Sequence, residues 1–222
     1  MPALLIFDCD GVLIDSEVIY ARVGSRTLTD AGIPISEEEI IARFTGVAGP
    51  ALFAELQAEH GVTLSEDFYA RQRVELDRAF VEDLKAVDGA AALLARLERP
   101  KCVASSTGTA RLTRCLEATG LARYFDGKIY SAALVEHGKP APDLFLYAAQ
   151  QMGAEPATCL VLEDSVTGVQ GAVAAGMAVV GFTGASHFPP GHDGALKAAG
   201  AGAIINHLDQ FDQEIAAFAA SA

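Results

Sequence analysis

Short apolar runs, each of a length that suits one β-strand, recur at intervals along this chain of 222 residues. Helical patterns separate most of them, which is typical of βαβ units, because parallel neighbours in a sheet need a long crossover connection. We therefore predict an α/β fold with a doubly wound parallel sheet. The predicted strands are residues 4–7, 102–105, 128–130, 159–162, 179–182 and 203–205. The predicted helices that alternate with them are residues 90–97, 110–119, 143–152, 166–175 and 208–219.

The alternation is interrupted once, between residues 16 and 86, where only helix-like periodicity is found. Ser36 precedes three glutamates with the spacing of a capping box, and Ser65 is a suitable N-cap for a second long helix. We predict that residues 16–86 form an all-helical cap domain. This cap is inserted into an α/β core domain made of residues 1–15 and 87–222.

The first predicted strand ends in two aspartates, Asp8 and Asp10. Side chains alternate along a strand, so the two carboxylates would point the same way if the strand continued. Two neighbouring carboxylates repel each other unless a cation or a shared proton relieves them. Ligands of parallel sheets bind at the carboxyl ends of the strands. The aspartate pair therefore predicts a reaction centre at this edge of the sheet.

Polar residues follow two further strands and precede one helix. Ser105 and Ser106 come at the end of one apolar run, Glu163 and Asp164 come at the end of another, and Lys139 stands in a loop rich in proline and glycine. The two serines and the lysine are candidates for binding a phosphate and stabilising its charge. The two acids are candidates for binding Mg²⁺, a hard cation that prefers oxygen ligands.

The combined set suits phosphoryl transfer. We expect Asp8 to attack phosphorus as a nucleophile, which splits a difficult displacement into two steps. We expect Asp10 to protonate the leaving oxygen and then to accept the proton of the attacking water. The catalytic residues predicted are therefore Asp8, Asp10, Ser105 and Lys139.

Each of these motifs also has an ordinary structural explanation when it is taken alone. Aspartate is common in turns, acids are favoured at helix N-termini, and most lysines are surface residues. The four motifs together favour a catalytic site over these structural explanations: the aspartate pair, the serines, the lysine and the acidic pair. We interpret the five histidines as structural or surface residues, with His187 and His192 on either side of a Pro-Pro-Gly loop.

With these motifs in this order, the chain resembles the haloacid dehalogenase superfamily of phosphotransferases. The resemblance covers essentially the full length of the chain. Residues 8–13 with Asp15 and Ser16 match the first motif, and Ser105, Lys139 and the Glu163-Asp164 pair match the other three. The resemblance implies a Rossmann-like core with a helical cap of the first type. Within the superfamily, the chain looks most like the β-phosphoglucomutase and 6-phosphogluconate phosphatase subfamily.

The resemblance also implies how Mg²⁺ is bound. Its ligands would be the carboxylate of Asp8, the backbone carbonyl of Asp10 and the carboxylate of Asp164, with Glu163 bound directly or through water. Mutases of this subfamily carry a histidine where this chain has Tyr20 and an arginine where it has Gly49. Since a mutase must hold the distal phosphate of a bisphosphate intermediate, these departures favour hydrolysis.

We predict a Mg²⁺-dependent phosphatase that acts on a small phosphorylated metabolite, a sugar or sugar-acid phosphate, through an aspartyl-phosphate intermediate. Two alternatives stay open. A sugar phosphomutase would use the same first step. A phospho-accepting signalling module of the receiver type would also combine aspartates, a hydroxyl, a lysine and Mg²⁺, although receivers have neither a second aspartate in this position nor a cap.

The composition restricts the partners of the chain. The formal net charge is −13, with 29 acidic and 16 basic residues, which argues against binding to nucleic acid. The same charge repels phosphorylated substrates, so a local positive group or metal must attract them. The four cysteines have neither CxxC nor zinc-site spacing. With neither a targeting segment nor a membrane span predicted, we expect a cytoplasmic monomer.

Overall fold

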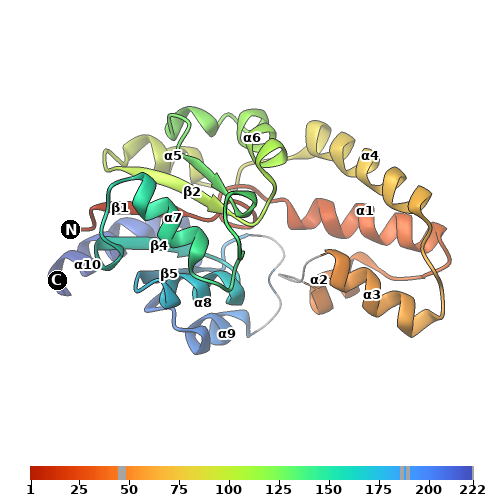
Figure 1. Cartoon of the computed structure of the whole chain (residues 1–222). Coiled ribbons are helices and arrows are strands. Elements are labelled where there is room, and N and C mark those ends of the chain that lie inside the picture. Colours follow the sequence, from red (N-terminus) through yellow and green to blue (C-terminus); the bar gives the residue numbers. More distant parts are fainter. Residues whose placement is uncertain (45–48, 186–187, 189–190, 222) are drawn as a thin grey trace.

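The computed structural model describes residues 1–44, 49–185, 188 and 191–221. It contains a parallel six-stranded sheet with the strand order β3-β2-β1-β4-β5-β6 (Figure 1). The strands are β1 (Leu4–Phe7), β2 (Lys101–Ser105), β3 (Ile129–Ser131), β4 (Cys159–Glu163), β5 (Ala178–Phe182) and β6 (Ala203–Ile205). Each agrees with its predicted range to within one residue at either end, and the predicted α/β fold with a doubly wound sheet is confirmed.

Helices α5 to α10 connect and cover these strands. They are α5 (Ala90–Arg96), α6 (Thr109–Ala118), α7 (Asp143–Gln151), α8 (Val166–Ala174), α9 (His192–Ala199) and α10 (Phe211–Ser221), with a 3₁₀ turn at Leu208–Gln210 before α10. The sequence pattern does not predict α9. The strand order reverses direction between β1 and β4, and open α/β sheets bind ligands beside such a switch point.

Both faces of the sheet are buried, as the continuous apolar strands require. Leu5 and Phe7 of β1 point into one core, which includes residues of α5, α6 and α10. Leu4 and Ile6 point into the other core, with residues of α7, α8 and α9. Phe7 meets the ring of Phe211 edge to face, with the ring centroids 5.7 Å apart. The two cores hold β1 rigidly, and with it the aspartates that follow.

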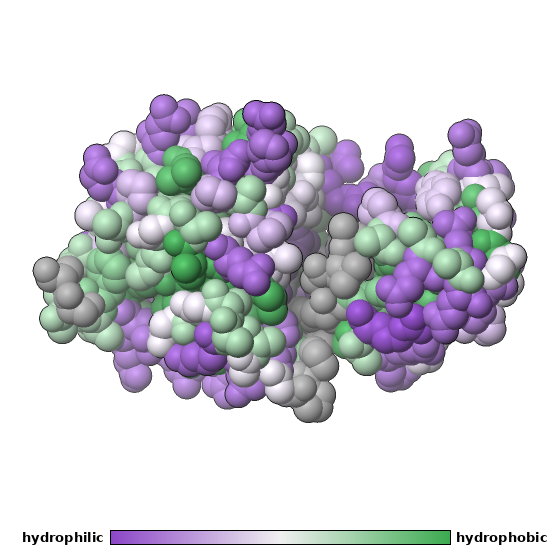
Figure 2. All heavy atoms as spheres, turned by 60° about the horizontal axis from the view of Figure 1, so that its bottom comes forward, coloured by the Kyte–Doolittle hydropathy of each residue, from purple (hydrophilic) through white to green (hydrophobic). Residues whose placement is uncertain are grey.

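A segment of four helices lies between β1 and α5 in the sequence, beyond the carboxyl ends of the strands (Figure 1). These helices are α1 (Glu17–Asp30), α2 (Glu37–Phe44), α3 (Gly49–His60) and α4 (Glu66–Asp83). They share a hydrophobic cluster that is separate from the two cores of the sheet and includes Leu28, Ile33 and Leu56. Figure 2 shows hydrophilic side chains over much of the outer surface of this segment.

The helix caps predicted in this segment are present. Ser65 Oγ accepts a hydrogen bond from the backbone N–H of Phe68 (3.2 Å) at the start of α4. Ser36 Oγ accepts one from Glu39 N (3.1 Å) at the start of α2. Within the described part of the chain, no helix combines the length and the hydrophobicity that crossing a bilayer needs.

Candidate active site

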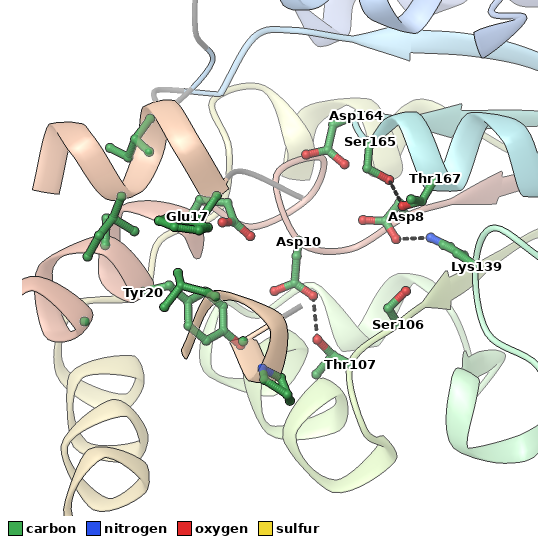
Figure 3. Close-up of a pocket in the computed structure, with 18 of the residues that line it drawn as sticks. Asp8, Asp10, Glu17, Tyr20, Ser106, Thr107, Lys139, Asp164, Ser165 and Thr167 are labelled. Carbon is green, nitrogen blue, oxygen red and sulfur yellow. Dashed lines mark hydrogen bonds and ion pairs between the residues drawn. The ribbon is translucent and has the colours of Figure 1, made fainter. Parts of the chain in front are cut away.

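The predicted nucleophile, lysine and first acid meet at the carboxyl ends of β1 and β4. Asp8 follows β1, Glu163 is the last residue of β4, and Lys139 lies in the loop before α7. Lys139 Nζ donates to the carboxylate of Asp8 (Figure 3). It also donates to Glu163 Oε1 at 2.5 Å. The exposed fractions of these side chains are 8% for Asp8, 3% for Lys139 and 0% for Glu163. The structure therefore brings the three residues together as a buried ion cluster.

Burial and like charge act together on the acids. Burial raises the pKa of Asp8 well above its usual range, the charge of Lys139 opposes this, and the charges of Glu163 and Asp10 add to it. The pKa of Asp164 is raised for the same reasons, first by burial and then by the carboxylates of Glu163 and Asp8. Burial alone would lower the pKa of Lys139, but Asp8 and Glu163 outweigh it and raise this pKa. One ammonium group is thus surrounded by more negative charge than it can balance.

The excess of carboxylates fits a divalent cation. Asp8, Glu163 and Asp164 each offer a carboxylate oxygen, and these oxygens lie within 4.8 Å of one another. All three residues are buried, and carboxylates are the ligands that hard cations such as Mg²⁺ prefer. The donor set therefore fits the predicted metal.

Asp10 is held by hydroxyl groups. Its Oδ1 accepts a hydrogen bond from Ser16 Oγ (2.7 Å), and its Oδ2 accepts one from Thr107 Oγ1 (2.8 Å) and a longer one from Ser105 Oγ (3.4 Å). Ser16 and Thr107 were not predicted as site residues. Ser16 belongs to the first motif and Thr107 follows the two serines at the end of β2, but only the fold shows that they converge on one carboxylate.

The two predicted phosphate-binding serines are placed differently. Ser105 ends β2, is only 1% exposed, and accepts a hydrogen bond from Thr107 N (3.0 Å). Ser106 lines the cavity above the strand ends, together with Thr107. Ser105 therefore shapes the loop after β2, while Ser106 is open to a ligand.

Glu163 is fixed from a second side by the start of α8. Ser165 donates to Glu163 Oε2 through its backbone N–H (2.8 Å) and through Oγ (2.9 Å). Ser165 Oγ also accepts a hydrogen bond from Gly168 N (3.0 Å) and so caps α8. A Cβ atom on Gly168 would lie 1.8 Å from Glu163 Oε1, so this position in the first turn of α8 has room only for glycine.

His192 also lies at the site, which the sequence interpretation missed. Its Nε2 is 2.6 Å from the backbone carbonyl oxygen of Asp164, and its ring stacks on Phe188 with the centroids 4.8 Å apart. His187 and the prolines at 189 and 190 lie outside the described residues, so the interpretation of this loop stays a prediction.

A cavity of about 890 Å³ joins the strand ends to the four-helix segment. Its wall on the strand side includes Asp8, Asp10 and Lys139, and its wall on the helix side includes Tyr20 of α1 and apolar residues of α2 and α3. Arg111 of α6 lines it too and donates to the Tyr20 hydroxyl (3.3 Å).

The chain is similar to several known proteins. A family model described as haloacid dehalogenase-like hydrolase matches residues 2–176. A 6-phosphogluconate phosphatase from Escherichia coli is 35% identical over 190 residues, which are 84% of this chain and 85% of that protein. A fructose-1-phosphate phosphatase from the same organism is 34% identical over 79% of this chain and 94% of its own length. The structure of a haloacid dehalogenase-like protein from Agrobacterium tumefaciens has 43% identity and a TM-score of 0.91, and the match covers 99% of this chain and 100% of that chain.

Proposed function

Since the chain belongs to the haloacid dehalogenase-like hydrolases, we propose that it is a Mg²⁺-dependent phosphatase of small phosphorylated metabolites, either sugar phosphates or sugar-acid phosphates. The observation that carries the proposal is the ion cluster of Asp8, Lys139 and Glu163, with Asp10 held beside it by hydroxyl groups. Relatives named as phosphatases of 6-phosphogluconate and fructose 1-phosphate support the substrate class.

In the first chemical step, a carboxylate oxygen of Asp8 forms a bond to phosphorus and the ester P–O bond breaks. Asp10 gives its proton to the leaving alkoxide, so a neutral alcohol departs. The hydrogen bonds from Ser16 and Thr107 keep the Asp10 carboxyl group aimed at the leaving oxygen. Lys139 and the residues after β2 stabilise the negative charge on the phosphoryl oxygens.

In the second step, water attacks the aspartyl-phosphate on Asp8. Asp10, now ionised, accepts the proton of this water, and cleavage of the P–O bond to Asp8 releases inorganic phosphate. The nucleophile is regenerated and Asp10 is protonated again, so one cycle consumes one water molecule. The same residue thus serves as acid and then as base, which requires a carboxyl group that is held in one place.

Mg²⁺ would be held by the carboxylates of Asp8 and Asp164 and by the backbone carbonyl of Asp10, with Glu163 bound directly or through water. When bound, the cation screens the repulsion between Asp8 and the phosphoryl oxygens. Three buried carboxylates with oxygens within 4.8 Å of one another support this assignment.

We also propose that residues 16–86 act as a cap domain on a core of residues 1–15 and 87–222. The hydrophobic cluster that the four helices share supports this division, as does the cavity that lies between them and the strand ends. Ile19 of α1 and Phe80 of α4 belong to one core of the sheet and so anchor the cap to it. Closure of a cap over such a cavity excludes bulk water while the phosphoryl group is transferred.

The test is release of inorganic phosphate from a panel of sugar, sugar-acid and nucleotide phosphates in the presence of Mg²⁺. The Asp8→Asn variant is expected to lose at least about a thousandfold in kcat, because it removes the nucleophile. The matched control is Asp67→Asn, which removes an exposed carboxylate on α4 paired only with Arg71 among the ion pairs described. Near wild-type turnover by Asp8→Asn would contradict the mechanism, and a product that retains its phosphate would indicate a mutase.

A further inference from the structure

Arg111 stands at the junction between the sheet domain and the four-helix segment. Its guanidinium donates to the hydroxyl of Tyr20 on α1 at 3.3 Å and to the carboxylate of Asp77 on α4 at 3.4 Å. Both contacts are long for N–H···O hydrogen bonds, and a guanidinium has five N–H donors. Because its side chain is 28% exposed and lines the cavity, this group can donate to a ligand as well.

Arg111 belongs to a small group of basic side chains, although the chain as a whole is strongly acidic. Asp77 is shared between Arg111 and Arg114, the second at 3.7 Å, so two guanidinium groups face one carboxylate. Among the described residues that line the cavity, Arg111 and Lys139 carry the permanent positive charges, and Lys139 is bonded to Asp8 and Glu163. A second anion in the cavity would therefore be attracted to Arg111.

Arg111 and Asp10 line the same cavity, so a leaving group that takes its proton from Asp10 can extend toward Arg111. Asp10 marks the position of the leaving oxygen, and Thr107, which binds Asp10, precedes Arg111 by only four residues. Burial and then the charge of Asp10 raise the pKa of Tyr20, which indicates that Tyr20 is close to that carboxylate. In Figure 3, Asp10 lies between Tyr20 on one side and Asp8 with Lys139 on the other.

We propose that Arg111 and the Tyr20 hydroxyl bind a carboxylate on the leaving group, so that the enzyme prefers sugar-acid phosphates to neutral sugar phosphates. The inference rests on the proposed phosphatase function. A guanidinium forms two parallel hydrogen bonds with a planar carboxylate, and partial burial strengthens them. A carboxylate brings one negative charge to this part of the cavity, whereas a second phosphate would bring about twice that charge close to Glu17, which also lines the cavity.

The subsite is held rigidly by an aromatic ring. Tyr20 packs edge to face on Phe80, with the centroids 5.1 Å apart, and the Arg111 guanidinium lies over the same ring at 5.7 Å. Both groups are thereby oriented before a ligand arrives, which lowers the entropic cost of binding. Arg111 touches the distal part of the substrate and none of the reacting atoms, so its role is in specificity.

The test compares 6-phosphogluconate with sorbitol 6-phosphate, which differ only at C1, where the first has a carboxylate and the second a hydroxymethyl group. The measured quantity is the ratio of their kcat/KM values. Wild-type enzyme is expected to favour the acid, and Arg111→Gln to lower this ratio by about 10- to 100-fold, since a hydrogen bond between charged groups contributes about that factor. Arg78→Gln, an exposed matched control on α4 whose ion pair is with Glu82, is expected to keep the ratio within about twofold.

Tyr20→Phe is the second variant, because it removes the hydroxyl and keeps the ring on Phe80. It is expected to lower the same ratio by about tenfold, the lower end of the effect of one hydrogen bond to a charged group. If Arg111 only joined α6 to the four-helix segment, both activities would fall in parallel and the ratio would not change, which would overturn the inference.

Fructose 1,6-bisphosphate serves as a third probe. A loss in Arg111→Gln that is confined to this bisphosphate would overturn the assignment to a carboxylate. Wild-type enzyme that releases phosphate from none of the probes would refute the proposed function and this inference together. An unchanged ratio in an active enzyme would refute the inference alone.

Discussion

Replacing Gly168 by alanine tests whether the shape of α8 positions Glu163. The added Cβ would lie 1.8 Å from Glu163 Oε1 and 2.0 Å from its Cδ. An ordinary contact between such atoms is about 3.5 Å, so the carboxylate has to move by roughly 1.5 Å. Glu163 is completely buried and bonded to Lys139 at 2.5 Å and to Ser165 at 2.8 and 2.9 Å. A shift of this size breaks at least one of these bonds.

The magnitude follows from the bonds that are lost. A hydrogen bond to a charged group contributes about 1.5–3 kcal/mol, so we expect Gly168→Ala to lower the free energy of unfolding by about 3 kcal/mol. We also expect kcat/KM to fall by about a hundredfold, as a misplacement of about 1 Å does in other active sites. Helix propensity alone predicts the opposite sign for stability, because alanine in a helix interior is favoured over glycine by about 1 kcal/mol. A lower free energy of unfolding in Gly168→Ala would therefore indicate displacement of Glu163, whereas a higher one would indicate helix propensity alone.

The assay is denaturant unfolding together with phosphate release as a function of Mg²⁺ concentration. The matched control is Gly194→Ala in α9, where an added Cβ meets no heavy atom within 4 Å, and it is expected to leave activity unchanged. Adding Glu163→Asp to Gly168→Ala shortens the acid by one methylene, and part of the lost stability should return. If Gly168→Ala were as stable and as active as wild type, the argument about space at this helix start would be wrong.

Two further predictions concern the acid–base residue and the metal. Thr107→Val removes the 2.8 Å hydrogen bond to Asp10 at nearly constant volume, and we expect kcat to fall by about tenfold, the effect of one hydrogen bond to a charged group, while Thr109→Val in the first turn of α6 serves as control. Unchanged kcat in steady-state assays would show that Thr107 does not orient Asp10. Removal of divalent cations with EDTA is expected to abolish phosphate release, and added Mg²⁺ to restore it; full activity in EDTA would rule out the cation requirement.

The local features of the fold could be predicted from the sequence because they depend on neighbours along the chain. The four inner strands β1, β2, β4 and β5 are almost completely buried, and they therefore form apolar runs that end where polar residues begin. The caps at Ser36 and Ser65 depend on residues three positions ahead, so their spacing is visible in the sequence. Helix α9 escaped prediction because its sequence is rich in alanine and has only one buried leucine, Leu196, to mark a core-facing side.

The residues that surround Asp10 show what the sequence could not supply. Ser16 and Thr107 are separated by 91 positions, counted from their sequence numbers, and they meet because β1 and β2 are neighbours in the sheet. Nothing in the sequence around Ser16 or Thr107 indicates that its side chain binds Asp10. The same holds for His192, which reaches the carbonyl of Asp164 from the start of α9.

The sequence by itself determined the class of fold, the strand boundaries and the residues that stand at the strand ends, because periodicity and motif spacing are properties of short segments. Only the tertiary structure decided which hydroxyl groups orient Asp10, how Gly168 makes room for Glu163, and that Arg111 of α6 meets Tyr20 of α1 in one cavity. These contacts join segments that are far apart in the chain, and packing alone brings them within hydrogen-bonding distance.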